Sequence, residues 1–145
     1  MDKQIAAAGF PLCPSAQPEM DGSVGFGVVG GSAEEPRVGY LTTPMRVTED
    51  LLALSKPVPP TEVFRFAAPC VGTACRHFDG TNCTLVTRTV QLLPVVVTNL
   101  PACVIRPTCR WWQQEGKAAC LRCPQIVTQN YQPTEPQRQA AEATR

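Results

Sequence analysis

Eight cysteines limit what this chain can fold into more than any other feature of its sequence, and seven of them lie between positions 70 and 123. Thiolates are preferred ligands of iron–sulfur clusters and zinc, and structural disulfides are rare in a reducing cytoplasm. The N-terminal residues lack the length and positive start of a signal peptide, so we expect a cytoplasmic protein whose cysteines bind metal. The eight are Cys13, Cys70, Cys75, Cys83, Cys103, Cys109, Cys120 and Cys123.

Proline and glycine set a second limit. Fifteen prolines and ten glycines in 145 residues favour fixed loops over regular secondary structure. An interrupted core in so small a chain is marginally stable, and bound metals commonly make up the deficit. We therefore expect a small α+β or irregular, metal-dependent fold. In it, an N-terminal β-hairpin unit would pack on a loop-rich, cysteine-rich module with short helices.

The composition divides the chain into four segments. Apolar stretches at 24–29 and 37–41 predict the two strands of the hairpin, and Thr48 is a suitable N-cap for a short helix. The end of the chain is rich in Gln, Thr and Pro, which is typical of a flexible tail. The segments are an N-terminal segment that contributes Cys13 (1–20), a β-hairpin plus short helix unit (21–66), a cysteine-rich metal-cluster module (67–128) and a flexible C-terminal tail (129–145).

The module opens with the pattern Cys-x4-Cys-x-His-x5-Cys, formed by Cys70, Cys75, His77 and Cys83. His77 is the only histidine of the chain. The dipeptide Asp79-Gly80 is a hairpin-type turn signal. A tight turn there would place residue 76 or 77 opposite Cys83 and bring Cys75 close enough to Cys83 to share one metal centre.

A second group has the pattern Cys-x5-Cys-x10-Cys-x2-Cys, formed by Cys103, Cys109, Cys120 and Cys123. A continuous helix would separate Cys109 from Cys120 by roughly 16 Å, since each residue rises about 1.5 Å. One shared centre therefore requires a break, and Gly116 is the natural place for it. Without such a break, Cys109 and Cys120 would serve different centres.

The cysteine spacings favour iron–sulfur clusters over zinc. Structural zinc sites usually show two short Cys-x2–4-Cys knuckles, whereas here only Cys120 and Cys123 form a two-residue knuckle. Longer, irregular spacings suit a [4Fe–4S] cube, whose irons accept sulfurs from several directions. Proline also follows a cysteine at Cys13-Pro14 and Cys123-Pro124, as it does in bacterial ferredoxins. Zinc is the alternative cofactor. A third interpretation is that the cysteines form disulfides, or that some form disulfides while others bind metal.

Eight cysteines make two sets of four, most simply Cys13 with the first trio and the second group by itself. His77 is the alternative eighth ligand, although a lone histidine among cysteines is more often a second-shell group that hydrogen-bonds near the ligands. An interleaved assignment, as in two-cluster ferredoxins, stays open. Residues 70–123 carry six basic and two acidic side chains, and this balance of +4 would offset the charge of about −4 on two oxidised clusters.

The tryptophan pair Trp111 and Trp112 allows two interpretations. The indoles would shield a cluster and fill a thin core, or they would form a platform for a partner or for nucleic-acid bases. No catalytic constellation accompanies the cysteines, so we do not expect an enzyme. The longest apolar runs are also far short of a bilayer span, so we expect no membrane contact.

These features together predict an iron–sulfur protein with two [4Fe–4S] clusters. It would act in electron transfer or as an accessory subunit of a redox complex, with a protein redox or assembly partner. One alternative is a zinc-binding structural or interaction module. Another is an iron- or oxygen-sensing regulator associated with nucleic acid, to which scattered basic residues lend little support.

Overall fold

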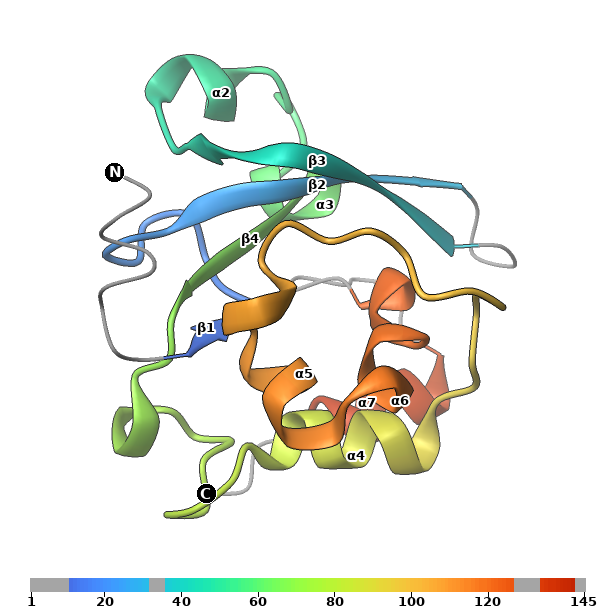
Figure 1. Cartoon of the computed structure of the whole chain (residues 1–145). Helices are drawn as coiled ribbons and strands as arrows, with labels where there is room; N and C mark the ends of the chain where they lie inside the picture. Colours follow the sequence, from blue (N-terminus) through green and yellow to red (C-terminus); the bar gives the residue numbers. More distant parts are fainter. Residues whose placement is uncertain (1–10, 32–35, 127–133, 143–145) are drawn as a thin grey trace.

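The fold is α+β, as expected from the sequence, with a four-stranded antiparallel sheet and short helices (Figure 1). The computed structural model describes residues 11–31, 36–126 and 134–142. The strands lie in the order β1-β4-β2-β3. Their bounds are Leu12–Cys13 for β1, Val24–Gly31 for β2, Pro36–Arg46 for β3 and Phe64–Pro69 for β4.

The predicted hairpin is formed by β2 and β3, which pair from Val24↔Arg46 to Gly31↔Pro36. The register shifts between Gly25 and Gly27, so this strand carries a bulge. A Cβ atom at Gly27 would lie 2.5 Å from Cγ1 of Val38, so the close approach of the two strands requires glycine there. The shift also leaves Phe26 buried in the core.

Strand β4 lies inside the sheet and is buried along most of its length, because both of its faces are covered. Phe64, Phe66 and Ala68 point to one face and pack with Ala16 and Leu51. Ala67 belongs to the core on the other face, where the cysteine module packs. This two-residue alternation places Arg65, the one charged residue of the strand, on the face toward the module.

Two short helices follow the hairpin, α2 (Glu49–Ala53) and α3 (Pro60–Val63). Helix α2 begins as the sequence predicts, with the Oγ1 atom of Thr48 accepting a hydrogen bond of 3.1 Å from the backbone N–H of Leu51. It ends well before the prolines of the next loop. Leu51 then packs against the first face of β4 and anchors the helix to the sheet.

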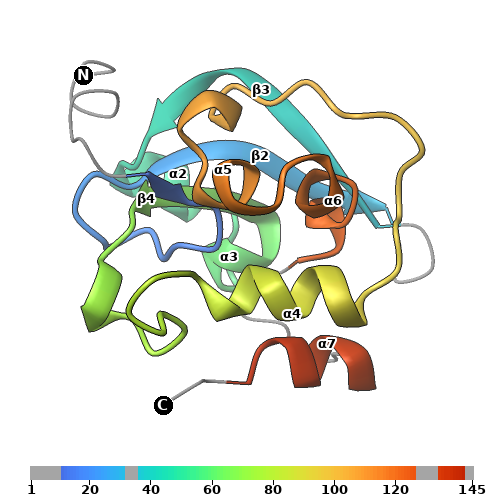
Figure 2. The same ribbon diagram turned by 60° about the horizontal axis from the view of Figure 1, so that its bottom comes forward.

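The module is built from short helical pieces joined by loops, and Figure 2 shows α7 alongside α4. Helices α4, α5 and α6 contact one another beneath the sheet, on the side opposite α2 in Figure 1. The pieces are η1 (Gly72–Ala74), α4 (Thr84–Leu92), η2 (Arg106–Thr108), α5 (Arg110–Glu115), α6 (Lys117–Cys120), η3 (Cys123–Gln125) and α7 (Glu135–Ala140). None of the helices among the described residues combines the length and the apolar character needed to cross a membrane.

The predicted break at Gly116 is present. Helix α5 ends at Glu115, Gly116 takes a φ of +67°, and α6 starts at Lys117. A positive φ is available to glycine without steric cost, so the chain changes direction there.

The predicted register of the Asp79-Gly80 turn is wrong. Phe78, not residue 76 or 77, pairs with Cys83. The reason is that Asp79 Oδ1 accepts hydrogen bonds from the amides of Thr81 (2.9 Å) and Asn82 (2.7 Å), which stabilise a longer loop than a two-residue turn.

Part of the predicted flexible tail forms helix α7. Thr134 and Gln137 make a reciprocal capping box at its start. Ala140 is 2% exposed, and its carbonyl accepts a hydrogen bond of 3.0 Å from Arg88 Nε of α4. The C-terminal helix is thereby attached to the module.

The backbone of Gly116 provides a test of the helix break. Its φ of +67° and ψ of −146° are conformations that essentially only glycine adopts. We expect Gly116→Ala to lower the free energy of unfolding by about 1–3 kcal/mol. Strain is the sole cause, because among the described residues no atom outside the chain neighbours lies within 4 Å of the added Cβ. Urea denaturation measures the change.

Gly30→Ala is the matched control for this substitution. It also meets open space, but its φ is not in the left-handed region. We expect a change within about 0.5 kcal/mol. Equal losses in the two variants would contradict the assignment of Gly116 as a conformational break.

Candidate metal centres

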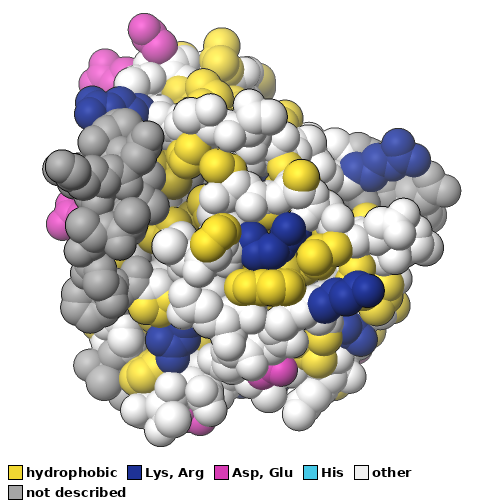
Figure 3. Space-filling view, viewed as in Figure 1, with side chains coloured by type: hydrophobic (Ala, Val, Ile, Leu, Met, Phe, Trp, Pro, Cys, Tyr) yellow, Lys and Arg dark blue, Asp and Glu magenta, His cyan; other side chains and the backbone are white. Residues whose placement is uncertain are grey.

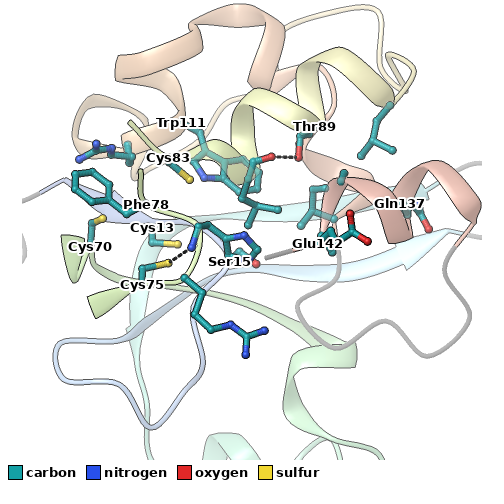
Figure 4. Close-up of a pocket in the computed structure, with 18 of the residues that line it drawn as sticks. Cys13, Ser15, Cys70, Cys75, Phe78, Cys83, Thr89, Trp111, Gln137 and Glu142 are labelled. Carbon is teal, nitrogen blue, oxygen red and sulfur yellow. Dashed lines mark hydrogen bonds between the residues drawn. The ribbon is translucent and has the colours of Figure 1, made fainter. Parts of the chain in front are cut away.

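Four cysteines line one cavity of about 680 Å³: Cys13, Cys70, Cys75 and Cys83 (Figure 4). The first lies in β1, the second directly after β4, the third directly after η1 and the fourth directly before α4. The short strand β1 is what adds Cys13 to the group, because Cys13 pairs with Ala68. The amide of Cys70 also donates a hydrogen bond of 2.8 Å to the carbonyl of Pro11.

The other four cysteines, Cys103, Cys109, Cys120 and Cys123, line another cavity. Cys109 directly precedes α5, Cys120 ends α6 and Cys123 begins η3, so the break at Gly116 is what turns α6 back toward Cys109. The structure thus brings the cysteines together in the same two sets of four that their spacing suggests, without interleaving.

The two cavities differ greatly in size. The second has a volume of about 20 Å³, against about 680 Å³ for the first. A volume of 20 Å³ accommodates roughly one water molecule. A cube at the second set would therefore require its lining side chains to turn outward. Across residues 11–31, 36–126 and 134–142, no three His, Cys, Asp or Glu side chains are close enough together to hold a single metal ion.

Burial favours the protonated form of one thiol in each set, Cys13 and Cys109. It raises the pKa of Cys13 and of Cys109 to about 12 each. Other cysteines of the same set raise these two pKa values further. A bound cation would reverse this preference, because a coordinating thiol is deprotonated.

Helix starts lie next to one thiol in each set. Burial raises the pKa of Cys83, and the amides of Leu85 and Val86 in the first turn of α4 act against it. The amides of Trp112 and Trp111 act in the same way on Cys109.

His77 lines the first cavity but faces Arg88. Its Nδ1 atom lies 3.1 Å from Nη2 of Arg88. A guanidinium can only donate, so Nδ1 accepts and the ring proton is assigned to Nε2. Burial, followed by the charges of Arg88 and Arg76, lowers the pKa of His77. The neutral ring therefore carries its proton at Nε2 while its Nδ1 lone pair is used by Arg88, and this arrangement fits a second-shell neighbour better than a ligand.

The backbone of His77 also supports the first set. Its amide donates a hydrogen bond of 3.4 Å to Sγ of Cys75. Its carbonyl accepts from the amide of Thr84 at 2.7 Å, at the start of α4. The segment between Cys75 and Cys83 is held at both ends by these bonds.

Arg65 lies beside the cysteines but was not among the site residues predicted from the sequence. Its side chain is 1% exposed, and its guanidinium donates to the carbonyls of Pro14 (2.9 Å) and Cys123 (2.8 Å). It also donates to Sγ of Cys123 at 3.2 Å and lies 5.2 Å from the ring centre of Phe26. A charged residue inside the run Phe-Arg-Phe-Ala-Ala could have singled it out, since such a residue is almost never buried without a partner.

The buried charge of Arg65 is matched by thiols rather than by a carboxylate. Burial lowers the pKa of its guanidinium, but the neighbouring Cys123 sulfur and Tyr40 hydroxyl raise it, and the net pKa is raised. None of its hydrogen bonds within the described part of the chain goes to an Asp or Glu.

Other arginines of the module bind backbone carbonyls. Arg122 donates to Leu93 and Ala118, each at 2.8 Å, and Arg110 donates to Thr81 at 3.1 Å. The same side chain of Arg110 lies 5.1 Å from the ring centre of Phe78. On the face drawn in Figure 3 the basic side chains are scattered among apolar ones rather than gathered in one patch. These arginines fasten loops together.

The two adjacent tryptophans, Trp111 and Trp112, differ in burial and in role. Trp111 is 1% exposed, belongs to the core and lines both cavities. Trp112 is only partly buried and carries the guanidinium of Arg106 at 5.5 Å from its ring centre. The expectation that these rings fill a thin core holds for Trp111, whereas Trp112 lies near the surface.

The chain matches no protein-family model, no curated protein and no solved structure. Its function must therefore be argued from its own residues.

Arg65→Met tests the importance of the buried guanidinium. The substitution keeps much of the apolar length but leaves the carbonyls of Pro14 and Cys123 without their donor. A buried carbonyl without a donor costs about 1–3 kcal/mol, so we expect a loss of about 2–5 kcal/mol in the free energy of unfolding, measured by urea denaturation.

Arg138→Met is the control for this loss. Arg138 pairs with Glu135 on the exposed surface of α7, where an ion pair contributes little. We expect almost no change in stability. If the two variants are equally stable, Arg65 is not the structural cation described above.

Proposed function

We propose that this chain is an iron–sulfur protein that binds one [4Fe–4S] cluster at each set of four cysteines. In this role it transfers electrons or serves as an accessory subunit of a redox complex. The observation that carries the proposal is the grouping of eight cysteines into two cavities, four in each. We expect the protein to work in the cytoplasm with a protein redox partner.

The geometry of the first set favours a cluster over a single ion. Tetrahedral zinc with bonds of about 2.3 Å holds its four sulfurs roughly 4 Å apart. In the described residues no such compact group occurs, and the four cysteines line a cavity of about 680 Å³. A bulky cube fits this arrangement better than a zinc ion.

Charge supports the same proposal. Burial disfavours the thiolates of Cys13 and Cys109, one in each set, so a bound group would have to supply positive charge at these sulfurs. The iron ions of a cluster do this. The remaining negative charge of the cluster would in turn be offset by Arg65, which already donates to Cys123.

A zinc ion at the second set is the alternative, although among the described residues the cysteines there would have to move closer together to hold it. The cavity there has room for only about one water-sized particle, and Cys120 and Cys123 form the short knuckle that zinc sites use. In that case the second site would be structural, and only the first would carry electrons. A chain with two zinc ions would be an interaction module.

The structure lends little support to the alternative function of a regulator that associates with nucleic acid. The guanidinium groups of Arg65 and Arg122 donate to backbone carbonyls inside the protein and are turned away from a phosphate backbone. The face in Figure 3 carries no continuous basic patch among its described residues. Electron transfer therefore ranks ahead of nucleic-acid binding.

Metal analysis of protein purified without oxygen tests the proposal. We expect about eight irons and eight sulfides per chain and no zinc. Four irons with one zinc would support the structural zinc at the second set. Zinc without iron would overturn the proposal.

Cys13→Ser tests the eightfold assignment. Loss of the fourth ligand should remove about half of the iron, and Cys109→Ser should remove the other half. His77→Ala is the control, because its Nδ1 already accepts from Arg88, and we expect it to keep the full iron content. Full iron in the Cys13 variant together with loss in the His77 variant would make His77 the ligand.

The difference in cavity size predicts two rates of cluster loss in air. The first cluster would lie in the larger cavity, which has room for solvent and oxygen, and should react with oxygen before the second. Iron content followed over time should fall to about half and then decline more slowly. Cys109→Ser, which keeps only the first cluster, should show the fast phase alone, and Cys13→Ser the slow phase alone. A single shared rate would contradict the prediction.

A further inference from the structure

We propose that the first cavity binds a small apolar carboxylate, such as a medium-chain fatty acid, whose head group lies at Trp111 and whose chain extends toward α7. The proposal goes beyond the proposed function and requires no cluster at either cysteine set. It concerns the part of the cavity that the cysteines do not line.

The first cavity is large enough for an organic molecule. Its volume of about 680 Å³ lies within the range of about 300–1,000 Å³ that is typical of small-molecule sites. Figure 4 shows the four cysteines gathered at one end of the cavity and Gln137 and Glu142, at the α7 end of the chain, at the other. The cysteines therefore account for only one end of it.

One face of α4 forms an apolar wall along the cavity. Leu85, Thr89 and the C-cap residue Leu93 all line it, and their spacing of four residues places them on one side of the helix. This stripe spans roughly 12 Å, since each residue rises about 1.5 Å. The hydroxyl of Thr89 is used within the helix, because it donates to the carbonyl of Leu85 at 2.9 Å. The wall, to which α7 adds the buried Ala140, therefore fits an alkyl chain.

An unpaired donor lies at the cysteine end of the cavity. Trp111 is 1% exposed, yet its Nε1 has no hydrogen-bond partner within the described residues. Figure 4 shows its ring at the cavity wall, next to Cys83. The second cavity, which Trp111 also lines, is too small for an organic molecule. A buried indole N–H usually has an acceptor, so the unpaired donor points to an acceptor on a molecule bound in the first cavity.

Basic side chains at the same end favour a carboxylate as that acceptor. Arg76 and Arg110 both line the cavity. The guanidinium of Arg110 lies 5.1 Å from the ring centre of Phe78, which Figure 4 shows at the cysteine end. At the α7 end the lining charges are one basic and one acidic, Arg138 and Glu142, so they cancel. This difference in charge orients a carboxylate toward the cysteines and its chain toward α7.

Equilibrium dialysis of the full chain against radiolabelled octanoate tests the site. The protein is purified without oxygen, and its iron is measured in the same sample. We expect one octanoate per chain at about 1 mM free ligand, where even a weak site is occupied, and much weaker binding of octanol, which has no charge. Absence of octanoate binding, or equal binding of octanol, would overturn the proposal. The iron content separately shows whether the proposed function fails.

A pair of variants on α4 locates the alkyl chain. Leu85→Phe adds volume to the cavity wall and should weaken octanoate binding at least tenfold. Leu92→Phe is the matched control, because Leu92 belongs to the same helix, is 39% exposed and does not line the cavity. It should bind octanoate as the wild type does. Equal affinities in the two variants would overturn the placement of the chain along α4.

A pair of indole variants locates the head group. Trp111→Phe removes a hydrogen bond to a charged group and should weaken octanoate binding roughly tenfold or more. Trp112→Phe, at the adjacent tryptophan that lines neither cavity, should keep the wild-type affinity. Equal affinities would overturn the assignment of the donor. If Trp111→Phe fails to fold, the α4 variants and the comparison of octanoate with octanol decide the proposal.

Discussion

The structure depends first on the buried guanidinium of Arg65. Its side chain extends from strand β4, inside the sheet, to the carbonyl of Pro14, which follows Cys13, and to the carbonyl of Cys123. One side chain therefore joins the sheet to both cysteine sets. A charge so deeply buried is stable only with good partners. Here the partners are two carbonyls and the sulfur of Cys123, and the fold is organised around this buried cation.

The module compensates for its lack of regular structure with side chains. Loops cannot satisfy their own carbonyls as helices and strands do. Arg88, Arg110 and Arg122 bind such carbonyls from other parts of the chain, and Gln114 does the same for Cys83. The positive charge of the module, which could be read as a surface for phosphate, is therefore used largely inside the protein. Loops fixed in this way can hold eight cysteines at defined positions.

Local features could be predicted from the sequence, and tertiary ones could not. The glycine-containing hairpin, the Thr48 cap and the break at Gly116 are set by residues close in the chain, and each occurs as expected. The register of the turn before Cys83 was predicted wrongly, because the hydrogen bonds of Asp79 stabilise a longer loop than the tight turn that Asp79-Gly80 favours. The roles of Arg65 and Trp111 follow from contacts with distant segments that no pattern encodes. Helix α7 was missed because its composition resembles a tail, while its capping box and Ala140 attach it to α4.

The two-residue strand β1 has a consequence for the order of assembly. The second set lies between positions 103 and 123 and closes over short loops, whereas Cys13 must close a loop of more than fifty residues to reach Cys70. Loop closure costs more entropy as the loop lengthens, although slowly. During synthesis Cys13 leaves the ribosome long before its partners, and the first site is complete only after β1 has paired with β4. The pairing of the two-residue strand β1 thus determines when Cys13 joins the other three cysteines of the first set.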